Sequence, residues 1–168
     1  MVFADRSLDE MLMELNNPYP IMNYHIHGRT ETELMRQVID VSLQNRTLVE
    51  IVVSHIVSGQ YLTEAVQEAF INAYWWSNRK DSSKQIFYTE YLADNGYLIL
   101  VSTLKGGFDY REKIRKFQEG LPYSDKDTGG GFRWYNQEGL EVSFCNEGKT
   151  VMIRVINRKE SILASAAE

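Results

Sequence analysis

The sequence has a single cysteine, Cys145, so no disulfide can form within the chain, and a reducing, cytoplasmic setting is expected. Proline is also scarce, with 3 among 168 residues, which argues against a disordered or linker-rich chain. No apolar run reaches the roughly 18 residues that a membrane helix needs, so no membrane contact is expected. The first residues lack a basic stretch followed by an apolar one, and we therefore expect no signal peptide.

Positive charge is in deficit as well. The chain carries 18 lysines and arginines against 23 aspartates and glutamates, a formal net charge of -5. This balance does not favour direct nucleic-acid binding, which depends on an excess of Lys and Arg over a broad surface. Hydrophobic residues make up 43% of the 168 residues, enough for one domain built around one core.

The first part of the sequence is mainly helical in pattern. Ser7 and Glu10 form a capping box, which predicts a short helix that ends before a spacer at 18–20. A short strand is expected over 24–27. A helix with acidic residues in its first turn is expected over 30–45.

The next two segments differ in clarity. The run 48–57 is ambiguous, because its β-branched residues favour a strand while its apolar spacing also fits a helix, which its position favours. The helix expected over 60–77 is the clearest element, since its apolar residues recur at the spacing of a half-buried helix. These apolar residues are Leu62, Ala65, Val66, Ala69, Phe70, Ala73 and Tyr74.

Alternating apolar residues mark the remainder as strands. The Asp-Asn-Gly sequence at 94–96 predicts a tight turn between two of them, and 105–131 reads as a long loop with one short helix near 110–118. The expected strands cover 86–91, 97–101, 140–145 and 151–156. Helices followed by two hairpins predict an α+β fold, a two-layer sandwich with helices on one face of a mixed, mostly antiparallel sheet.

One polar row on the 60–77 helix has catalytic potential. Glu64, Glu68 and Asn72 are spaced by four residues and share one side of the helix. A carboxylate can act as a general base, and a carboxamide oxygen can bind Mg²⁺. On spacing alone a solvated face is favoured over a catalytic one, because amphipathic helices normally show such a polar row.

Two glycine-rich segments could approach a ligand closely. Gly106 and Gly107 follow a strand, and Gly129-Gly130-Gly131 ends the long loop, where backbone amides could bind phosphate or form a hinge. His25 and His27 share a strand face but have no third metal ligand at a suitable spacing.

Together these segments resemble the ATPase domain shared by gyrase and histidine kinases, the GHKL (Bergerat-type) ATPases, and most closely the bacterial anti-sigma factor serine kinases. Glu68 and Asn72 match the Glu, three residues, Asn spacing of that superfamily. The run Gly107-Phe108-Asp109 fits the end of its Asp-x-Gly-x-Gly-Phe motif, 129–132 fits its lid motif loosely, and 148–150 fits its last Gly-x-Thr.

The resemblance implies roles for these residues. Glu68 would be the general base or water-positioning residue, Asn72 would hold Mg²⁺, and Thr150 would lie near the adenine of ATP. The 110–131 segment would be the ATP lid. The nucleotide-binding positions that the resemblance assigns are Asn72, Thr103, Lys105, Gly107, Gly129, Gly130, Gly131 and Thr150.

Some positions depart from the family. Thr103 replaces the Asp that binds the adenine amino group, Lys105 replaces the first glycine, and Trp75 and Trp76 follow Asn72 where smaller or polar residues are usual. Two functions are therefore expected as alternatives. The first is an ATP-dependent serine kinase that acts on an antagonist protein, and the second is a non-catalytic interaction module of the same fold.

In either case the partner would be a sigma factor or an anti-anti-sigma-like regulatory protein, and a homodimer is compatible with both functions. The ATPase-like domain would cover 22–157, preceded by a helix and spacer over 1–21 and followed by a tail over 158–168.

Overall fold

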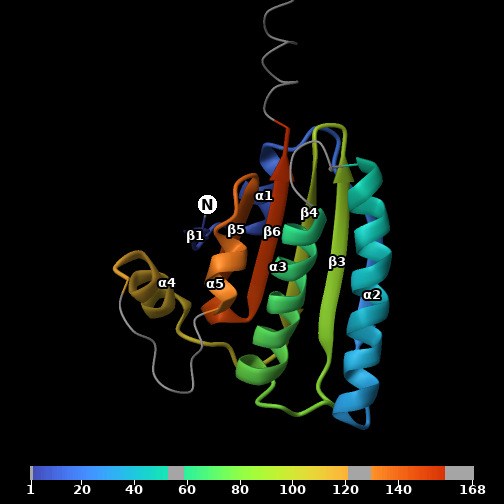
Figure 1. Cartoon of the computed structure of the whole chain (residues 1–168), viewed down its shortest axis with the longest axis vertical. Coiled ribbons are helices and arrows are strands. Elements are labelled where there is room, and N and C mark those ends of the chain that lie inside the picture. Colours follow the sequence, from blue (N-terminus) through green and yellow to red (C-terminus); the bar gives the residue numbers. More distant parts are fainter. Residues whose placement is uncertain (1, 53–58, 121–129, 158–168) are drawn as a thin grey trace, which may run out of the picture.

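The computed structural model of the chain describes residues 2–52, 59–120 and 130–157. Its centre is a six-stranded sheet with the strand order β1-β5-β6-β4-β3-β2 (Figure 1). All neighbouring strands are antiparallel except β1 and β5, which are parallel. The strands are β1 (Val2–Ala4), β2 (Tyr19–Ile26), β3 (Ile86–Ala93), β4 (Gly96–Thr103), β5 (Leu140–Cys145) and β6 (Thr150–Ile156).

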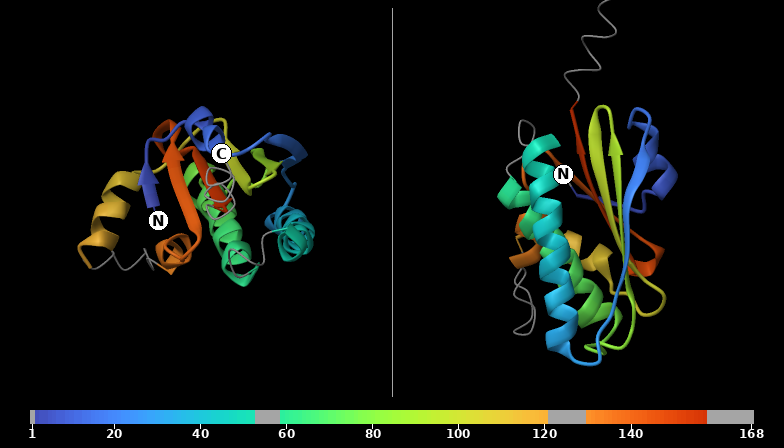
Figure 2. Two further views of the ribbon diagram at one scale, coloured as in Figure 1. Left: turned by 90° about the horizontal axis from the view of Figure 1, so that it is seen from above. Right: turned by 90° about the vertical axis from the view of Figure 1, so that its right-hand side faces the viewer.

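Helices cover one face of this sheet, which we call the inner face. The two long helices run side by side across it, and the views from above and from the side show both on the same side of the strands (Figure 2). The helices on the inner side are α2 (Glu31–Val52), α3 (Gly59–Asn72), its π-helical continuation η1 (Ala73–Ser77), α4 (Tyr110–Gln118) and α5 (Gly130–Tyr135). The expected α+β two-layer sandwich is confirmed.

The main core lies between the inner face and these helices. Alternate residues of the strands point into it, as the period of two requires. On β4, Tyr97, Ile99 and Val101 are buried there, opposite Leu62 and Phe70 of α3 in the same cluster. The apolar stripe of α3 is therefore what attaches the polar row of the same helix to the sheet.

A smaller core lies on the outer face, under α1 (Leu8–Met13). Arg154 of β6 is completely buried there. It donates hydrogen bonds to the carbonyl oxygen of Met11 at 2.8 Å, to the carboxylate of Glu14 at 3.1 Å, and from Nε to Glu141 at 2.8 Å. These hydrogen bonds join α1 and the residue after it to the sheet.

Several predicted elements are confirmed. Both hydrogen bonds of the capping box form between Ser7 and Glu10. The turn at 94–96 joins β3 to β4 in a regular antiparallel register. The helix near 110–118 has those bounds in the structure, with Asp109 as its N-cap.

Three elements differ from the prediction. The expected spacer at 18–20 is wrong in part, because β2 begins at Tyr19 and includes Pro20 beside a bulge on an edge strand, where proline is tolerated. The helix expected to end near residue 45 continues to Val52, so the first half of the ambiguous 48–57 run is helical, while 53–58 lie outside the described residues. Strand β1 was not predicted, since three residues give no periodicity.

Candidate functional site

The structure places Glu68 and Asn72 one turn apart near the end of α3, where this helix packs against α5. Asn72 is buried, and its side-chain nitrogen donates a hydrogen bond of 2.9 Å to the hydroxyl oxygen of Tyr135. The Tyr135 ring is held edge-on by Phe132 and Phe144, with ring centroids 5.8 Å and 5.5 Å away. A polar group is thereby fixed inside an aromatic cluster.

Glu68 lies half-buried beside this pair. Burial raises the pKa of its carboxyl to about 7, because the charged form loses solvation. Burial, and secondarily the charge of Glu68, also raises the pKa of the Tyr135 hydroxyl well above its usual value. A carboxyl that titrates near neutrality is suited to accept and release a proton. Glu64, one turn earlier, lines a hollow with Gln60, Thr63 and Gln67 instead.

The glycine loop after β4 packs directly against the end of η1. A Cβ atom on Gly106 would lie 1.9 Å from the carbonyl oxygen of Ser77, and one on Gly107 would lie 2.1 Å from that of Glu147. Both glycines also have positive φ angles, 86° and 113°. Glycine is required at these two positions by the approach of other backbone segments and by the turn itself.

Thr103 is the last residue of β4, and Lys105 lies in the glycine loop that follows it. Thr103 is buried at the end of β4, and its hydroxyl donates to the carbonyl oxygen of Lys105 at 3.2 Å. The Lys105 side chain is exposed. The Thr103 hydroxyl therefore stabilises the turn that follows β4.

Trp75 and Trp76 of η1 are partly exposed. Their side chains are 44% and 37% exposed. The ammonium of Lys80 lies 4.0 Å from the ring centroid of Trp75, and that of Lys113 lies 4.8 Å from the ring centroid of Trp76. Both indoles are thus partly exposed, each with a lysine ammonium near its ring.

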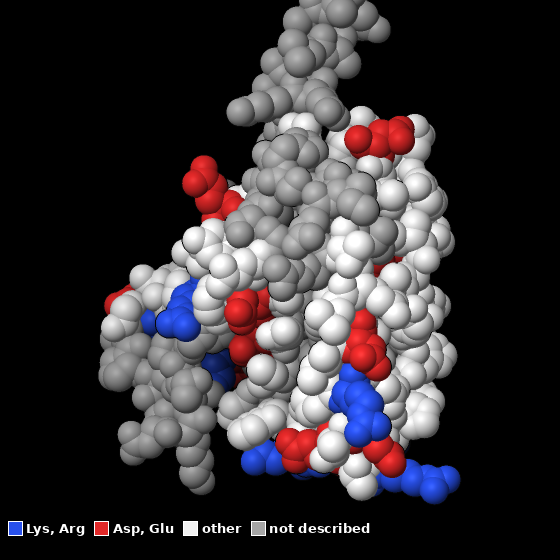
Figure 3. Space-filling model, turned by 45° about the vertical axis from the view of Figure 1, so that its right-hand side comes forward, with Lys and Arg blue, Asp and Glu red and all other residues white. Residues whose placement is uncertain are grey.

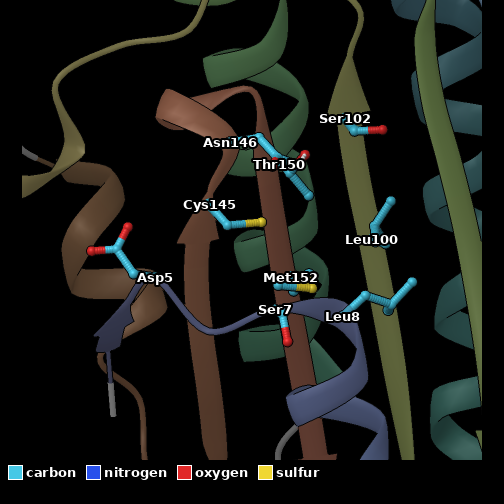
Figure 4. Close-up of a pocket in the computed structure, with 9 residues that line it drawn as sticks. All are labelled: Asp5, Ser7, Leu8, Leu100, Ser102, Cys145, Asn146, Thr150 and Met152. Atoms are coloured by element: carbon cyan, nitrogen blue, oxygen red, sulfur yellow. Dashed lines mark hydrogen bonds between the residues drawn. The ribbon is translucent and has the colours of Figure 1, made fainter.

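Thr150 lies on the opposite face of the sheet from Glu68 and Asn72, so the structure does not bring it to them. Its hydroxyl accepts a hydrogen bond of 3.1 Å from Asn146 at the edge of an outer cavity of about 510 Å³ (Figure 4). Burial raises the pKa of the Cys145 thiol in the same cavity, which disfavours the reactive thiolate. The other lining residues are Asp5, Ser7, Leu8, Leu100, Ser102 and Met152.

The structure describes only part of the segment predicted to be the ATP lid. Gly130 and Gly131 form the first turn of α5, whereas Gly129 lies outside the described residues. His25 and His27 are exposed, and His25 packs edge-on to Phe87 at 4.7 Å. Within residues 2–52, 59–120 and 130–157 there is no group of three or more His, Cys, Asp or Glu side chains that could hold a metal ion.

Sequence reasoning did not identify Tyr135 or Ser77 as parts of this region. Tyr135 follows the glycine run by four residues and has no motif of its own, and Ser77 contributes only its carbonyl oxygen. Contacts of this kind depend on how α5 and the glycine loop fold back onto α3, which no local pattern encodes.

No protein-family model matches the chain, and no curated sequence is significantly similar to it. None of the described helices combines the length and the apolar character needed to span a membrane. Charged side chains occur in small groups on the face seen in Figure 3, with no continuous field of either sign.

Proposed function

We propose that this protein is a regulatory protein of the anti-sigma kinase type, which binds Mg²⁺-ATP beside α3. The observation that carries this proposal is the pair of Glu68 and Asn72 on one side of the helix, with the pKa of the Glu68 carboxyl near 7. A carboxyl in this range is half ionised at neutral pH and can act as a general base.

The metal side of the site suits Mg²⁺ chemically. The Asn72 nitrogen donates to Tyr135, so the carboxamide oxygen would be the atom that binds the metal. Carboxamide and carboxylate oxygens are the donors that hard cations prefer. Bound Mg²⁺-ATP would supply the phosphoryl group and neutralise its charge, and Asn72 would hold the metal.

The reaction would be transfer of the γ-phosphoryl group to a serine of an antagonist protein. The serine oxygen forms the new P–O bond, the bond between the β–γ bridging oxygen and the γ-phosphorus breaks, and ADP leaves. Glu68 accepts the proton of the serine hydroxyl. We further propose that the protein is cytoplasmic and that its partner is a sigma factor or an antagonist protein. A homodimer is the proposed oligomeric state.

A second candidate is a non-catalytic interaction module of the same fold. It is favoured by the packing of the glycine loop. The backbone of Ser77 and of Glu147 occupies the space beside Gly106 and Gly107, and the Thr103 hydroxyl already donates to the carbonyl oxygen of Lys105. In this case the loop would be a structural turn and not a nucleotide cradle.

Calorimetric titration with Mg²⁺-ATP, Mg²⁺-ADP and ATP in EDTA separates the two candidates. We expect ATP binding that weakens without Mg²⁺ and in Asn72→Ala, and serine phosphorylation that is lost in Glu68→Gln. Glu64→Gln is the matched control, because Glu64 lies in the same polar row but lines a different hollow. Absence of any nucleotide heat with folded wild-type protein would favour the non-catalytic module.

A further inference from the structure

The outer face of the sheet is covered only in part by α1. This helix of six residues packs over Leu98 and Met152 in the smaller core. Beyond it lies the outer cavity of about 510 Å³, which Asn146 of the short turn η2 (Asn146–Gly148) also lines (Figure 4). Small-molecule sites commonly have volumes of about 300–1,000 Å³, so the outer cavity is large enough for such a ligand.

The strand register arranges the floor of the outer cavity in two rows. Ser102 of β4 and Cys145 of β5 both pair with Thr150 of β6. Residues that pair directly across antiparallel strands have side chains on the same face, so these three polar side chains lie side by side. The next row is apolar, because Leu100 pairs with Met152. The outer cavity therefore has a polar end and an apolar end.

The polar row contains one hydroxyl that lacks a partner. Thr150 accepts a hydrogen bond of 3.1 Å from Asn146, whereas the half-buried Ser102 side chain forms no hydrogen bond with any residue that the structure describes. A serine hydroxyl can both donate and accept a hydrogen bond. A hydroxyl, carbonyl or amide group of a ligand could therefore bind to Ser102.

The lining of the outer cavity offers no unpaired charge to a ligand. Asp5 is the one charged residue among the described residues that line it, and its carboxylate already accepts hydrogen bonds from Tyr110 and, at 2.8 Å, from Arg111. This carboxylate points away from Cys145 in Figure 4. Burial raises the pKa of the Cys145 thiol, which keeps that group uncharged at neutral pH. A charged ligand would lose hydration here without gaining a counter-ion.

We propose that the outer cavity binds a small uncharged molecule that has an apolar body and one hydrogen-bonding group. The apolar body would pack on Leu100 and Met152, and the hydrogen-bonding group would reach the hydroxyl of Ser102. This site lies on the opposite face of the sheet from Glu68, so it is separate from the proposed nucleotide site and goes beyond the proposed function.

The test uses the full chain without nucleotide and three probes that share an indole ring. Indole-3-ethanol is neutral, tryptamine is a cation and indole-3-acetate is an anion. Binding is measured by ligand-observed NMR and by the rate at which N-ethylmaleimide alkylates Cys145, the single cysteine of the chain. We expect indole-3-ethanol to bind saturably and to slow alkylation, and both charged probes to bind at least about tenfold more weakly.

Two variants test the residues of the floor. Ser102→Ala should weaken the binding of indole-3-ethanol about threefold to tenfold, as expected for one lost hydrogen bond. Leu100→Trp should abolish binding, because the larger side chain fills the apolar end. Thr89→Ala is the matched control, since Thr89 pairs with Leu100 from the neighbouring strand but does not line the outer cavity. Circular dichroism melting shows whether each variant is folded, and Ser102→Ala decides the result if Leu100→Trp does not fold.

Three outcomes would overturn the proposal. The first is that indole-3-ethanol neither binds the wild-type chain saturably nor protects Cys145. The second is that Thr89→Ala weakens binding as much as Ser102→Ala, and the third is that indole-3-acetate or tryptamine binds as tightly as indole-3-ethanol. Because no nucleotide is present, failure of this experiment leaves the Mg²⁺-ATP titration unaffected, and absence of nucleotide heat leaves the outer cavity untouched.

Discussion

The side-chain nitrogen of Asn72 on α3 donates to the hydroxyl oxygen of Tyr135 on α5 at 2.9 Å, and both side chains are buried. This hydrogen bond fixes which way the carboxamide of Asn72 is turned, since only its nitrogen can donate. It also joins the helix of the candidate site to the helix that follows the predicted lid. The orientation of a proposed metal ligand therefore depends on where α5 lies.

Removal of the Tyr135 hydroxyl tests this link. Tyr135→Phe keeps the ring in its aromatic cluster but leaves the buried Asn72 nitrogen without this acceptor, and we expect a loss of about 1–3 kcal/mol in the free energy of unfolding. Urea denaturation measures it. Tyr24→Phe is the control, because the hydroxyl of Tyr24 donates to Gln44 at an exposed position and its loss should change stability by less than about 0.5 kcal/mol. Equal losses of stability in the two variants would contradict a stabilising role of the hydrogen bond between Asn72 and Tyr135.

The raised pKa of Glu68 predicts a pH dependence of stability. Because the pKa is about 7 in the folded protein against 4.5 for the ordinary group, the folded state binds this proton more tightly than the unfolded state. Stability from this group is complete below about pH 4.5 and is lost as the pH rises through about 7. Glu68→Gln should remove this decline.

At pH 8 we therefore expect Glu68→Gln to be more stable than the wild type by about 2–3 kcal/mol, with little difference near pH 4.5. Denaturation curves at both values check this. Glu64→Gln, one turn earlier on α3, provides the comparison at a second carboxylate of the same row. A Glu68→Gln variant with the same pH profile as the wild type would show that the carboxyl is not desolvated.

Gly106 and Gly120 give a matched pair for the glycine loop. Both have positive φ angles, 86° and 63°, so alanine is strained at either position. A Cβ atom would meet the backbone of Ser77 at 1.9 Å in the first case and nothing within 4 Å in the second. We expect Gly120→Ala to destabilise by about 1 kcal/mol and Gly106→Ala by clearly more, measured as the shift in melting temperature.

Arg154 should be the most sensitive charged residue among those described. Arg154→Ala would remove a buried cation whose hydrogen bonds join Met11, Glu14 and Glu141, and we expect a loss of about 3–5 kcal/mol in the free energy of unfolding. Arg115→Ala removes the exposed ion pair with Glu119 on α4 and should change stability by less than about 1 kcal/mol. Chemical denaturation of both variants measures the difference. Retention of wild-type stability in Arg154→Ala would mean that α1 is held by its apolar contacts alone.

Local patterns predict most of the fold and only part of the candidate site. The α3 stripe, the hairpin at 94–96 and the Ser7 capping box depend on neighbours in sequence, and each is present in the structure. Strand β1 depends on β5, more than a hundred residues away, and no property of its three residues indicates that pairing. The same limit applies to Pro20, whose place in an edge strand is set by the neighbouring β3.

The candidate functional site shows most clearly what local sequence patterns do not predict. The spacing of Glu68 and Asn72 follows from helix geometry alone, so their common face was predictable. The contact of Gly106 with Ser77 depends on how the loop after β4 folds back onto η1. Thr150 faces outward because it precedes the inward-facing Val151 on β6, and the Gly-x-Thr motif does not say which face that is. Glycine-rich segments that look alike in sequence can thus serve close backbone packing instead of ligand contact.

The two edges of the sheet bear on how the molecule behaves at high concentration. One edge is β1, which has only three residues, and the other is β2, where Pro20 lacks an amide hydrogen and a bulge interrupts the register before Met22. Short strands, prolines and bulges at the edges make it difficult for another chain to add a strand. We therefore expect the folded protein to resist aggregation through its sheet edges.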